Sequence, residues 1–190
     1  MINENYLKSM NRQFSYYKSL GEKAISQISD DKLFVQVNQD SNSIATIVKH
    51  LSGNMISRWT DFLTTDGEKE WRNRDGEFEN DVKTRAELIA LWDKGWDRLF
   101  KTLNELKPEE LEKIIYIRNE GHTVMEAINR QLAHYPYHVG QIVYVAKMLK
   151  EKEWDSLSIP KNKSKEYNSG KFSEPKSQRH FTDEFLKKKD

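Results

Sequence analysis

The chain has 190 residues, enough for one domain with an apolar core of its own. It contains no cysteine, which excludes disulfides, thiolate metal sites and a thiol nucleophile supplied by the protein itself. Its 31 basic and 30 acidic residues give a formal net charge of +1, so overall charge gives no general reason to bind nucleic acid or an acidic membrane. We therefore expect a small-molecule partner, and neither nucleic acid nor a membrane.

The N-terminal segment and the distribution of apolar residues bear on location. Residues 1–6 read MINENY and carry amide and acidic side chains where a secretory signal would need an apolar run. No stretch approaches the roughly 18 consecutive apolar residues that would indicate a membrane span. These observations predict a cytoplasmic protein.

Four segments show the apolar periodicity of amphipathic helices. Capping boxes mark the start of the last two, with Thr84 paired to Glu87 and Thr123 paired to Glu126. Helices of this length with apolar stripes bury those stripes best against one another. We therefore predict an all-α fold, a four-helix bundle within residues 1–160. Its helices should cover residues 3–28, 44–65, 84–107 and 123–150.

The segments outside these helices differ in character. Residues 66–83 contain turn formers and no sustained periodicity, so we expect a long loop between the second and third helices, of a kind that often covers a functional site. Residues 114–117 have the composition of a brief extended segment. Residues 161–190 are rich in Lys, Ser, Asn and Glu and have little periodic apolar content. We expect this C-terminal tail to be extended or disordered.

Two histidines lie four residues apart in the predicted fourth helix. His134 and His138 share a helix face with Ala127 and Val145, so both rings should point inward. Two desolvated imidazoles without hydrogen-bond partners or a metal would be costly. His50, at the flank of the apolar stripe of the second helix, is a candidate third ligand. Three neutral imidazoles suit zinc or nickel, and less often iron or manganese, and leave coordination positions free for water or substrate.

The same residues allow other interpretations. A histidine such as His50 is often a hydrogen-bonded core residue, and histidines four apart on a helix are often structural. His122 precedes His134 by twelve residues, about 18 Å along a helix, and cannot share its ion. His180 lies in the polar tail, where we expect it to be solvated. Tyr135 occupies the place where a zinc-protease motif needs its glutamate, which disfavours peptide hydrolysis.

Several polar side chains are candidates for a supporting role. Asn54 and Arg58 follow His50 at four and eight positions, where they could orient a ligand and hold a substrate carboxylate. For Arg58 a surface or dimer ion pair is the interpretation we favour. Gln131 and Gln141, each three residues from a candidate histidine, could hydrogen-bond to it or be ordinary buried amides. Three tryptophans could line an apolar pocket, although aromatic residues at helical spacing usually form core: Trp59, Trp92 and Trp96.

Two segments resemble the DinB/YfiT-like superfamily, in particular its branch of small Gram-positive bacterial proteins of unassigned function. They are NSIATIVKHLSGN at residues 42–54, and GHT and QLAHYPYHVGQI within residues 121–142. The resemblance covers about residues 1–160. It implies a four-helix bundle in up-down-down-up order, one metal held by a histidine of the second helix and two of the fourth, and frequent homodimers. His50, His134 and His138 match those three positions.

Characterised members of this superfamily include bacillithiol S-transferases and mycothiol-dependent maleylpyruvate isomerases. The resemblance therefore implies thiol-dependent transfer or isomerisation with a low-molecular-weight thiol as nucleophile. A divalent cation would lower the pKa of that thiol, which suits a protein without cysteine. One alternative is a non-catalytic dimeric metal-binding bundle with a structural or stress-response role. Another is a metal-free bundle that binds an apolar ligand or a protein partner.

Overall fold

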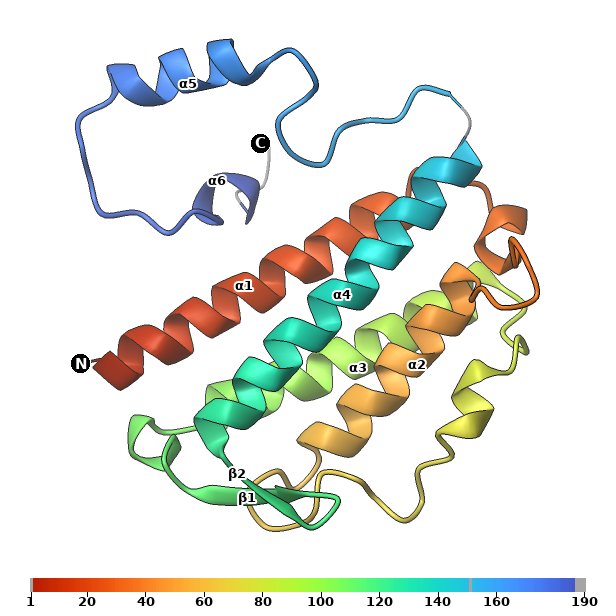
Figure 1. Cartoon of the computed structure of the whole chain (residues 1–190), viewed down its shortest axis with the longest axis vertical. Helices are drawn as coiled ribbons and strands as arrows, with labels where there is room; N and C mark the ends of the chain where they lie inside the picture. The colour runs from red at the N-terminus through yellow and green to blue at the C-terminus, as the bar shows by residue number, and fades with distance from the viewer. Residues whose placement is uncertain (1, 151, 187–190) are drawn as a thin grey trace.

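Four long helices form the body of the protein in the computed structural model, which describes residues 2–150 and 152–186 (Figure 1). α2 packs along α3, α1 packs along α4, and further contacts join α2 to α4 and α1 to α3. No helix among the described residues combines the length and the apolar character needed to cross a lipid bilayer. The four helices are α1 (Ile2–Ile25), α2 (Ile44–Trp59), α3 (Arg85–Glu105) and α4 (Val124–Lys150).

Both predicted capping boxes are present at the starts of α3 and α4. The Thr84 side chain accepts a hydrogen bond from the backbone N–H of Glu87, whose carboxylate accepts one from the backbone of Thr84. Thr123 and Glu126 exchange the same pair of bonds before α4. These bonds satisfy N–H groups that a helix leaves unpaired at its first turn, and so fix where each helix begins.

The core between the helices combines aliphatic side chains with a group of aromatic rings. Phe14, Trp96 and Tyr135, from α1, α3 and α4, are fully buried, and their ring centroids lie 5.9–6.5 Å apart. Trp92 packs beside Trp96 with a centroid separation of 5.4 Å. Trp92 and Trp96 are therefore core residues, the interpretation that aromatic spacing favoured.

The connection between α2 and α3 begins earlier than predicted. α2 ends at Trp59 instead of near residue 65, because Thr60 has an extended backbone (φ −80°, ψ 130°) and Asp61 then adopts a positive φ of 47°. The connection covers residues 60–84 and includes the short 3₁₀ helix η2 (Asp75–Phe78), which packs on α2. The predicted long loop thus lies against one side of α2. Two further 3₁₀ turns are η1 (Asp31–Phe34) and η3 (Pro108–Glu110).

A small antiparallel hairpin precedes α4. Its strands are β1 (Ile114–Ile117), where a brief extended segment was expected, and β2 (Glu120–Thr123), which was not predicted. The expected all-α fold is therefore corrected to a mostly helical fold with one hairpin. The Asp66 carboxylate accepts hydrogen bonds from the backbone N–H groups of Arg118 and Asn119 in the hairpin turn, at 2.9 and 2.8 Å. These bonds fasten the hairpin to the connection after α2.

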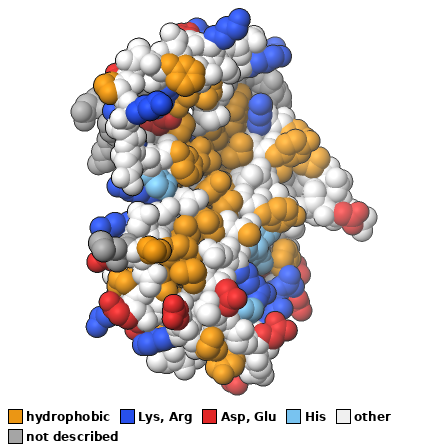
Figure 2. All heavy atoms as spheres, turned by 60° about the vertical axis from the view of Figure 1, so that its left-hand side comes forward, with side chains coloured by type: hydrophobic (Ala, Val, Ile, Leu, Met, Phe, Trp, Pro, Cys, Tyr) orange, Lys and Arg blue, Asp and Glu red, His pale blue; other side chains and the backbone are white. Residues whose placement is uncertain are grey.

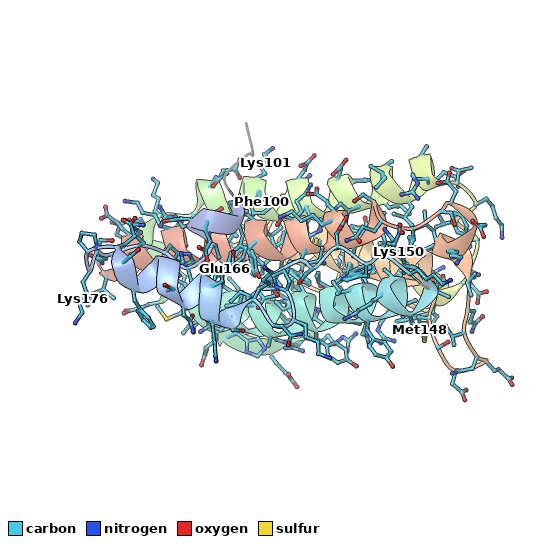
Figure 3. The ribbon with its side chains drawn as sticks, turned by 90° about the horizontal axis from the view of Figure 1, so that it is seen from above. Phe100, Lys101, Met148, Lys150, Glu166 and Lys176 are labelled. Atoms are coloured by element: carbon cyan, nitrogen blue, oxygen red, sulfur yellow. The ribbon has the colours of Figure 1, made fainter. Side chains whose placement is uncertain are left out.

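The prediction of an extended or disordered tail is wrong for two of its segments, α5 (Ser164–Ser173) and α6 (Asp183–Leu186). In Figures 1 and 3, α5, which carries Glu166, lies outside the four long helices. α6 contacts α1, where the ring of Tyr16 packs on Phe181 and Phe185. His180 is hydrogen-bonded to Ser9 at 3.1 Å instead of being solvated. Isolated aromatic residues gave no periodic signal, so this packing could not be read from the tail itself. Residues 187–190 of the predicted tail lie outside the described residues.

Candidate metal centre

Three histidine rings converge between α2 and α4. His50, His134 and His138 each offer one ring nitrogen, and these three atoms all lie within 4.8 Å of one another. The Nε2 atoms of His134 and His138 are 3.1 Å apart. Two nitrogens held about 2.1 Å from a tetrahedral ion would lie ~3.4 Å apart, so this spacing fits two ligands of one ion. The predicted convergence of the three residues is confirmed.

The other nitrogen of each ring faces a side-chain oxygen. An Nδ1–H that donates to such an oxygen leaves Nε2 unprotonated, with its lone pair directed toward the other rings. Converging lone pairs repel one another unless a cation or a proton lies between them. The rings are therefore oriented as three Nε2 ligands would be. The three contacts are His50 Nδ1 to Glu77 Oε2 (2.9 Å), His134 Nδ1 to Gln131 Oε1 (3.4 Å) and His138 Nδ1 to Gln141 Oε1 (2.7 Å).

The environment keeps two of these rings neutral. Burial lowers the pKa of His134 to about 3, and the charges that His138 and His50 would carry act in the same direction. Burial also lowers the pKa of His138, although its hydrogen bond to Gln141 acts in the opposite direction. Both rings are therefore unprotonated near pH 7, the form in which imidazole binds a metal.

The three histidines open onto a cavity of about 430 Å³. Asn54 and Phe78 contribute to its wall, together with several arginines. In Figure 2, basic side chains gather beside histidine side chains on the face shown. Among the described residues, no fourth histidine and no carboxylate joins the group of candidate ligands. An ion held there would therefore keep a coordination position facing the cavity.

Comparison with known proteins identifies the family. Residues 1–163 match the family described as "Protein of unknown function (DUF1572)". The chain belongs to the DUF1572 family. No curated protein and no solved structure matches it significantly.

Sequence reasoning missed the carboxylate that contacts the triad of this DUF1572 chain. Glu77, in η2, is 6% exposed and binds His50 through Oε2. Arg72 grips the same carboxylate from the other side, through Nε to Oε1 at 2.8 Å and Nη2 to Oε2 at 2.9 Å. Burial alone would raise the pKa of Glu77, but the bonds from His50 and Arg72 outweigh it and hold this pKa below its usual value. Glu77 is thus an anion at neutral pH and fixes the His50 ring.

A glycine on α2 makes room for that carboxylate. A Cβ atom added at Gly53 would lie 2.1 Å from Glu77 Oε1, closer than atoms can approach. Gly53 stands three residues after His50, and a glycine inside a helix normally weakens it. Together with the glutamates of the following loop, this glycine was the only sequence signal that could have indicated Glu77.

The remaining candidate residues divide into those at the cavity and those in the core. Asn54 and Arg58 both line the cavity and are each 5% exposed, so of the surface or dimer ion pair that we favoured for Arg58, the surface position is wrong. An ion pair across a dimer stays a prediction. Tyr135 donates from its hydroxyl to Asn54 Oδ1 at 3.1 Å and accepts from Trp59 Nε1 at 2.9 Å. None of the three tryptophans lines this cavity, and all three are buried, in agreement with the core interpretation that we favoured. His122, on β2, contacts Arg130 and stands apart from the triad, as expected.

Proposed function

We propose that this protein binds one divalent metal ion through the Nε2 atoms of His50, His134 and His138. Zinc or nickel fits three neutral imidazoles best, and iron or manganese are the alternatives. One observation carries the proposal: every Nδ1 atom faces a side-chain oxygen while the opposite edges of the three rings converge. A cluster without metal would need a proton between the Nε2 atoms of His134 and His138. Each neutral ring carries one proton, and in both rings it lies on Nδ1, where it is donated to a glutamine oxygen.

We also propose that the four long helices form the up-down-down-up bundle of the DinB/YfiT-like superfamily. The short connection through η1 joins α1 to α2 at one end, and the hairpin that leads into α4 lies at the opposite end (Figure 1). The long connection over residues 60–84 runs back along α2, which lets α3 follow the same direction as α2. The sequence resemblance at residues 42–54 and 121–142 supports the same assignment.

The reaction that we propose is metal-dependent transfer of a low-molecular-weight thiol, of the bacillithiol type, to an electrophile. A divalent ion supplies Lewis acidity that lowers the pKa of a thiol, and this chain has no cysteine of its own. The protein side chains hold the site in place. Phe78 stacks on His50 with a centroid separation of 4.9 Å and covers one face of that ring. Asn54, fixed by the Tyr135 hydroxyl, contributes an amide to the cavity wall.

A non-catalytic dimeric bundle, with a structural or stress-response role, is the second candidate. A purely structural ion is usually enclosed by four protein ligands, whereas only three candidate ligands lie together among the described residues. This difference favours catalysis. The homodimer stays a proposal, supported by exposed side chains along α4: Tyr137 (63% exposed), Tyr144 (70%) and Met148 (44%).

Metal content tests the ligand assignment. We expect the purified full chain to carry about one ion per chain, and His134→Ala to lose stoichiometric binding because two imidazoles hold an ion far more weakly than three. His122→Ala is the matched control, since it removes a histidine outside the triad. Elemental analysis of the three proteins measures the effect. An unchanged metal content in His134→Ala would contradict the assignment.

Conjugation of bacillithiol to a fluorogenic haloalkyl electrophile tests the reaction. Protein loaded with zinc, nickel or manganese should accelerate it above the rate without enzyme, and His134→Ala treated in the same way should not. A background rate with all three metals, in protein shown to hold one ion, would rule out the transferase and favour the non-catalytic candidate.

A further inference from the structure

Five arginines line the cavity beside the histidine triad, and metal binding uses none of them. They come from four separate parts of the chain: α2, the connection after it, the turn between β1 and β2, and α4. Such convergence of one residue type on a single hollow is not explained by the pattern of any one helix. We call these residues the arginine wall: Arg58, Arg72, Arg74, Arg118 and Arg130.

Protein carboxylates neutralise only part of this wall. Glu68 is shared by three guanidinium groups, at 3.0 Å from Arg72, 3.4 Å from Arg118 and 3.7 Å from Arg58. Glu77, which is buried, is the other acidic partner and binds Arg72 and His50. Within the described part of the chain, no acidic side chain lines the cavity itself. The cavity wall therefore has an excess of positive charge, and a low-dielectric hollow concentrates its field.

Two exposed arginines of the wall, Arg74 and Arg130, have no buried acidic partner among the described residues. Arg74 reaches only the fully exposed Asp75, at 4.0 Å, and lies over the ring of Phe78. Arg130 contacts His122 at 3.2 Å, a partner that brings no negative charge. Both guanidinium groups therefore add to the positive potential at the mouth of the cavity.

Arg58 is the most unusual member of the wall. It lies in the last turn of α2 and is only 5% exposed, and its Nε and Nη1 atoms have no hydrogen-bond partner among the described residues. Its contact with Glu68, at 3.7 Å, is too long for a hydrogen bond. A buried guanidinium group with two unpaired nitrogen atoms is costly, and a bound carboxylate or phosphate would compensate its charge. Gly67 packs tightly against the same side chain, since an added Cβ would lie 2.8 Å from Nη1.

We propose that the cavity binds a small ligand through a carboxylate or phosphate oxyanion that is held by Arg58 and its neighbours in the arginine wall, while another part of the ligand faces the triad. Guanidinium groups match both oxyanions in charge and in hydrogen-bond geometry. The identification of this ligand as a substrate rests on the proposed function, but its binding does not require the metal. An apolar ligand, as in the metal-free alternative, does not fit such a wall.

Calorimetric titration of the full chain with succinate and with inorganic phosphate tests the proposal. The titrations are done before and after treatment with a chelator, and succinamide serves as the neutral control. We expect saturable binding of at least one oxyanion in both states of the protein, weaker at high salt, and no binding of succinamide. The oxyanion that binds more tightly identifies the class of ligand.

Variants locate the binding. Arg58→Met should weaken oxyanion binding by about tenfold or more, because it removes a buried charge-assisted partner. Arg98→Met, on α3 and outside the cavity, should leave it unchanged. Should Arg58→Met fail to fold, Arg130→Met replaces an exposed residue of the wall and should weaken binding by a few-fold. If folded Arg58→Met binds the oxyanion as tightly as the wild type does, the proposal is overturned. If only Arg130→Met folds, the same result in that variant overturns it.

The outcome is separable from that of the metal proposal. Oxyanion binding that persists in His134→Ala supports the arginine wall even if no variant binds metal. Absence of binding for both oxyanions in wild-type protein that holds one ion would overturn the wall and leave the metal proposal intact.

Discussion

α2 and α4 border two regions that contrast in chemistry, the apolar core and the charged cavity. On the core side, Trp92 and Trp96 are so tightly packed that their indole N–H groups have no hydrogen-bond partner among the described residues. On the cavity side, the Nε and Nη1 atoms of Arg58, which belong to a charged group, have no hydrogen-bond partner among the described residues. A neutral N–H can be offset by packing, whereas a buried charge needs a counter-charge. We therefore expect the first region to determine stability, and the second to carry the binding that we propose.

The largest effect that we expect comes from a core substitution, which should change stability without changing metal affinity. Trp96→Ala removes a fully buried ring and should lower the free energy of unfolding by about 3–5 kcal/mol. Metal affinity of the folded protein should change little, because Trp96 does not line the cavity. Urea unfolding and metal titration below the transition measure both quantities. Phe172→Ala, at a position 84% exposed, is the control and should be nearly neutral. A large loss of metal affinity in Trp96→Ala would break the proposed separation.

The second prediction concerns a substitution at the cavity, which should change metal affinity. Glu77→Gln keeps the shape of the side chain but removes the charge that orients His50, and should weaken metal binding by about 10–100-fold, equivalent to about 1.4–2.7 kcal/mol. Competition with a chromogenic chelator measures this affinity. Glu79→Gln, two residues away and exposed, should have no effect. If both variants bind metal as the wild type does, Glu77 has no role in orienting the ligand.

A third change acts on the boundary between the regions. Tyr135→Phe leaves Trp59 Nε1 without its acceptor and Asn54 Oδ1 without its donor. Because both partners are buried, the free energy of unfolding should fall by about 1–3 kcal/mol. Tyr144→Phe, at an exposed position of α4, should be neutral in the same urea titration. Equal stability of the two variants would show that the core and the cavity are not joined through this hydroxyl.

A fourth effect is a pH dependence confined to the cavity side. The pKa of His134 is lowered from 6.5 to about 3 in the folded protein, so the unfolded chain binds more protons between these values. Stability of metal-free protein should therefore fall as pH falls through this window and be independent of this group above about pH 7. Thermal unfolding of chelator-treated wild type and His134→Gln between pH 4 and 8 measures it, and the variant should show the shallower slope. Parallel curves would exclude the contribution of His134.

The sequence predicted those parts of the fold that depend on local patterns. The start of α3 follows from Thr84 and Glu87, whose bonds are made within one turn. The end of α2 was missed because the apolar pattern continues to Phe62 while the backbone turns at Asp61. β2 was missed as well, since EGHT has no apolar alternation and pairs only because β1 lies beside it.

The residues of the candidate site also divide into those that local spacing predicted and those that only tertiary packing brings together. His134 and His138 could be found because their spacing places them on one face of a helix, and Gln131 and Gln141 because each lies one turn from a histidine. Glu77 was missed, since it lies 27 positions after His50 and only the packing of the connection on α2 brings them together. The family resemblance supplied His50 as the third ligand, which spacing alone left open.

Arg72 links the two halves of the cavity, because one guanidinium group holds the Glu77 that orients His50 and also belongs to the arginine wall. A metal ion that fixes the His50 ring also fixes Glu77, and so restricts the Arg72 side chain. An anion bound to Arg72 would in turn weaken or shift the contact between Arg72 and the Glu77 carboxylate. By thermodynamic reciprocity, ion and oxyanion should alter each other's affinity by the same factor. The contacts from His50 through Glu77 to Arg72 thus couple occupancy of the histidine triad to occupancy of the arginine wall.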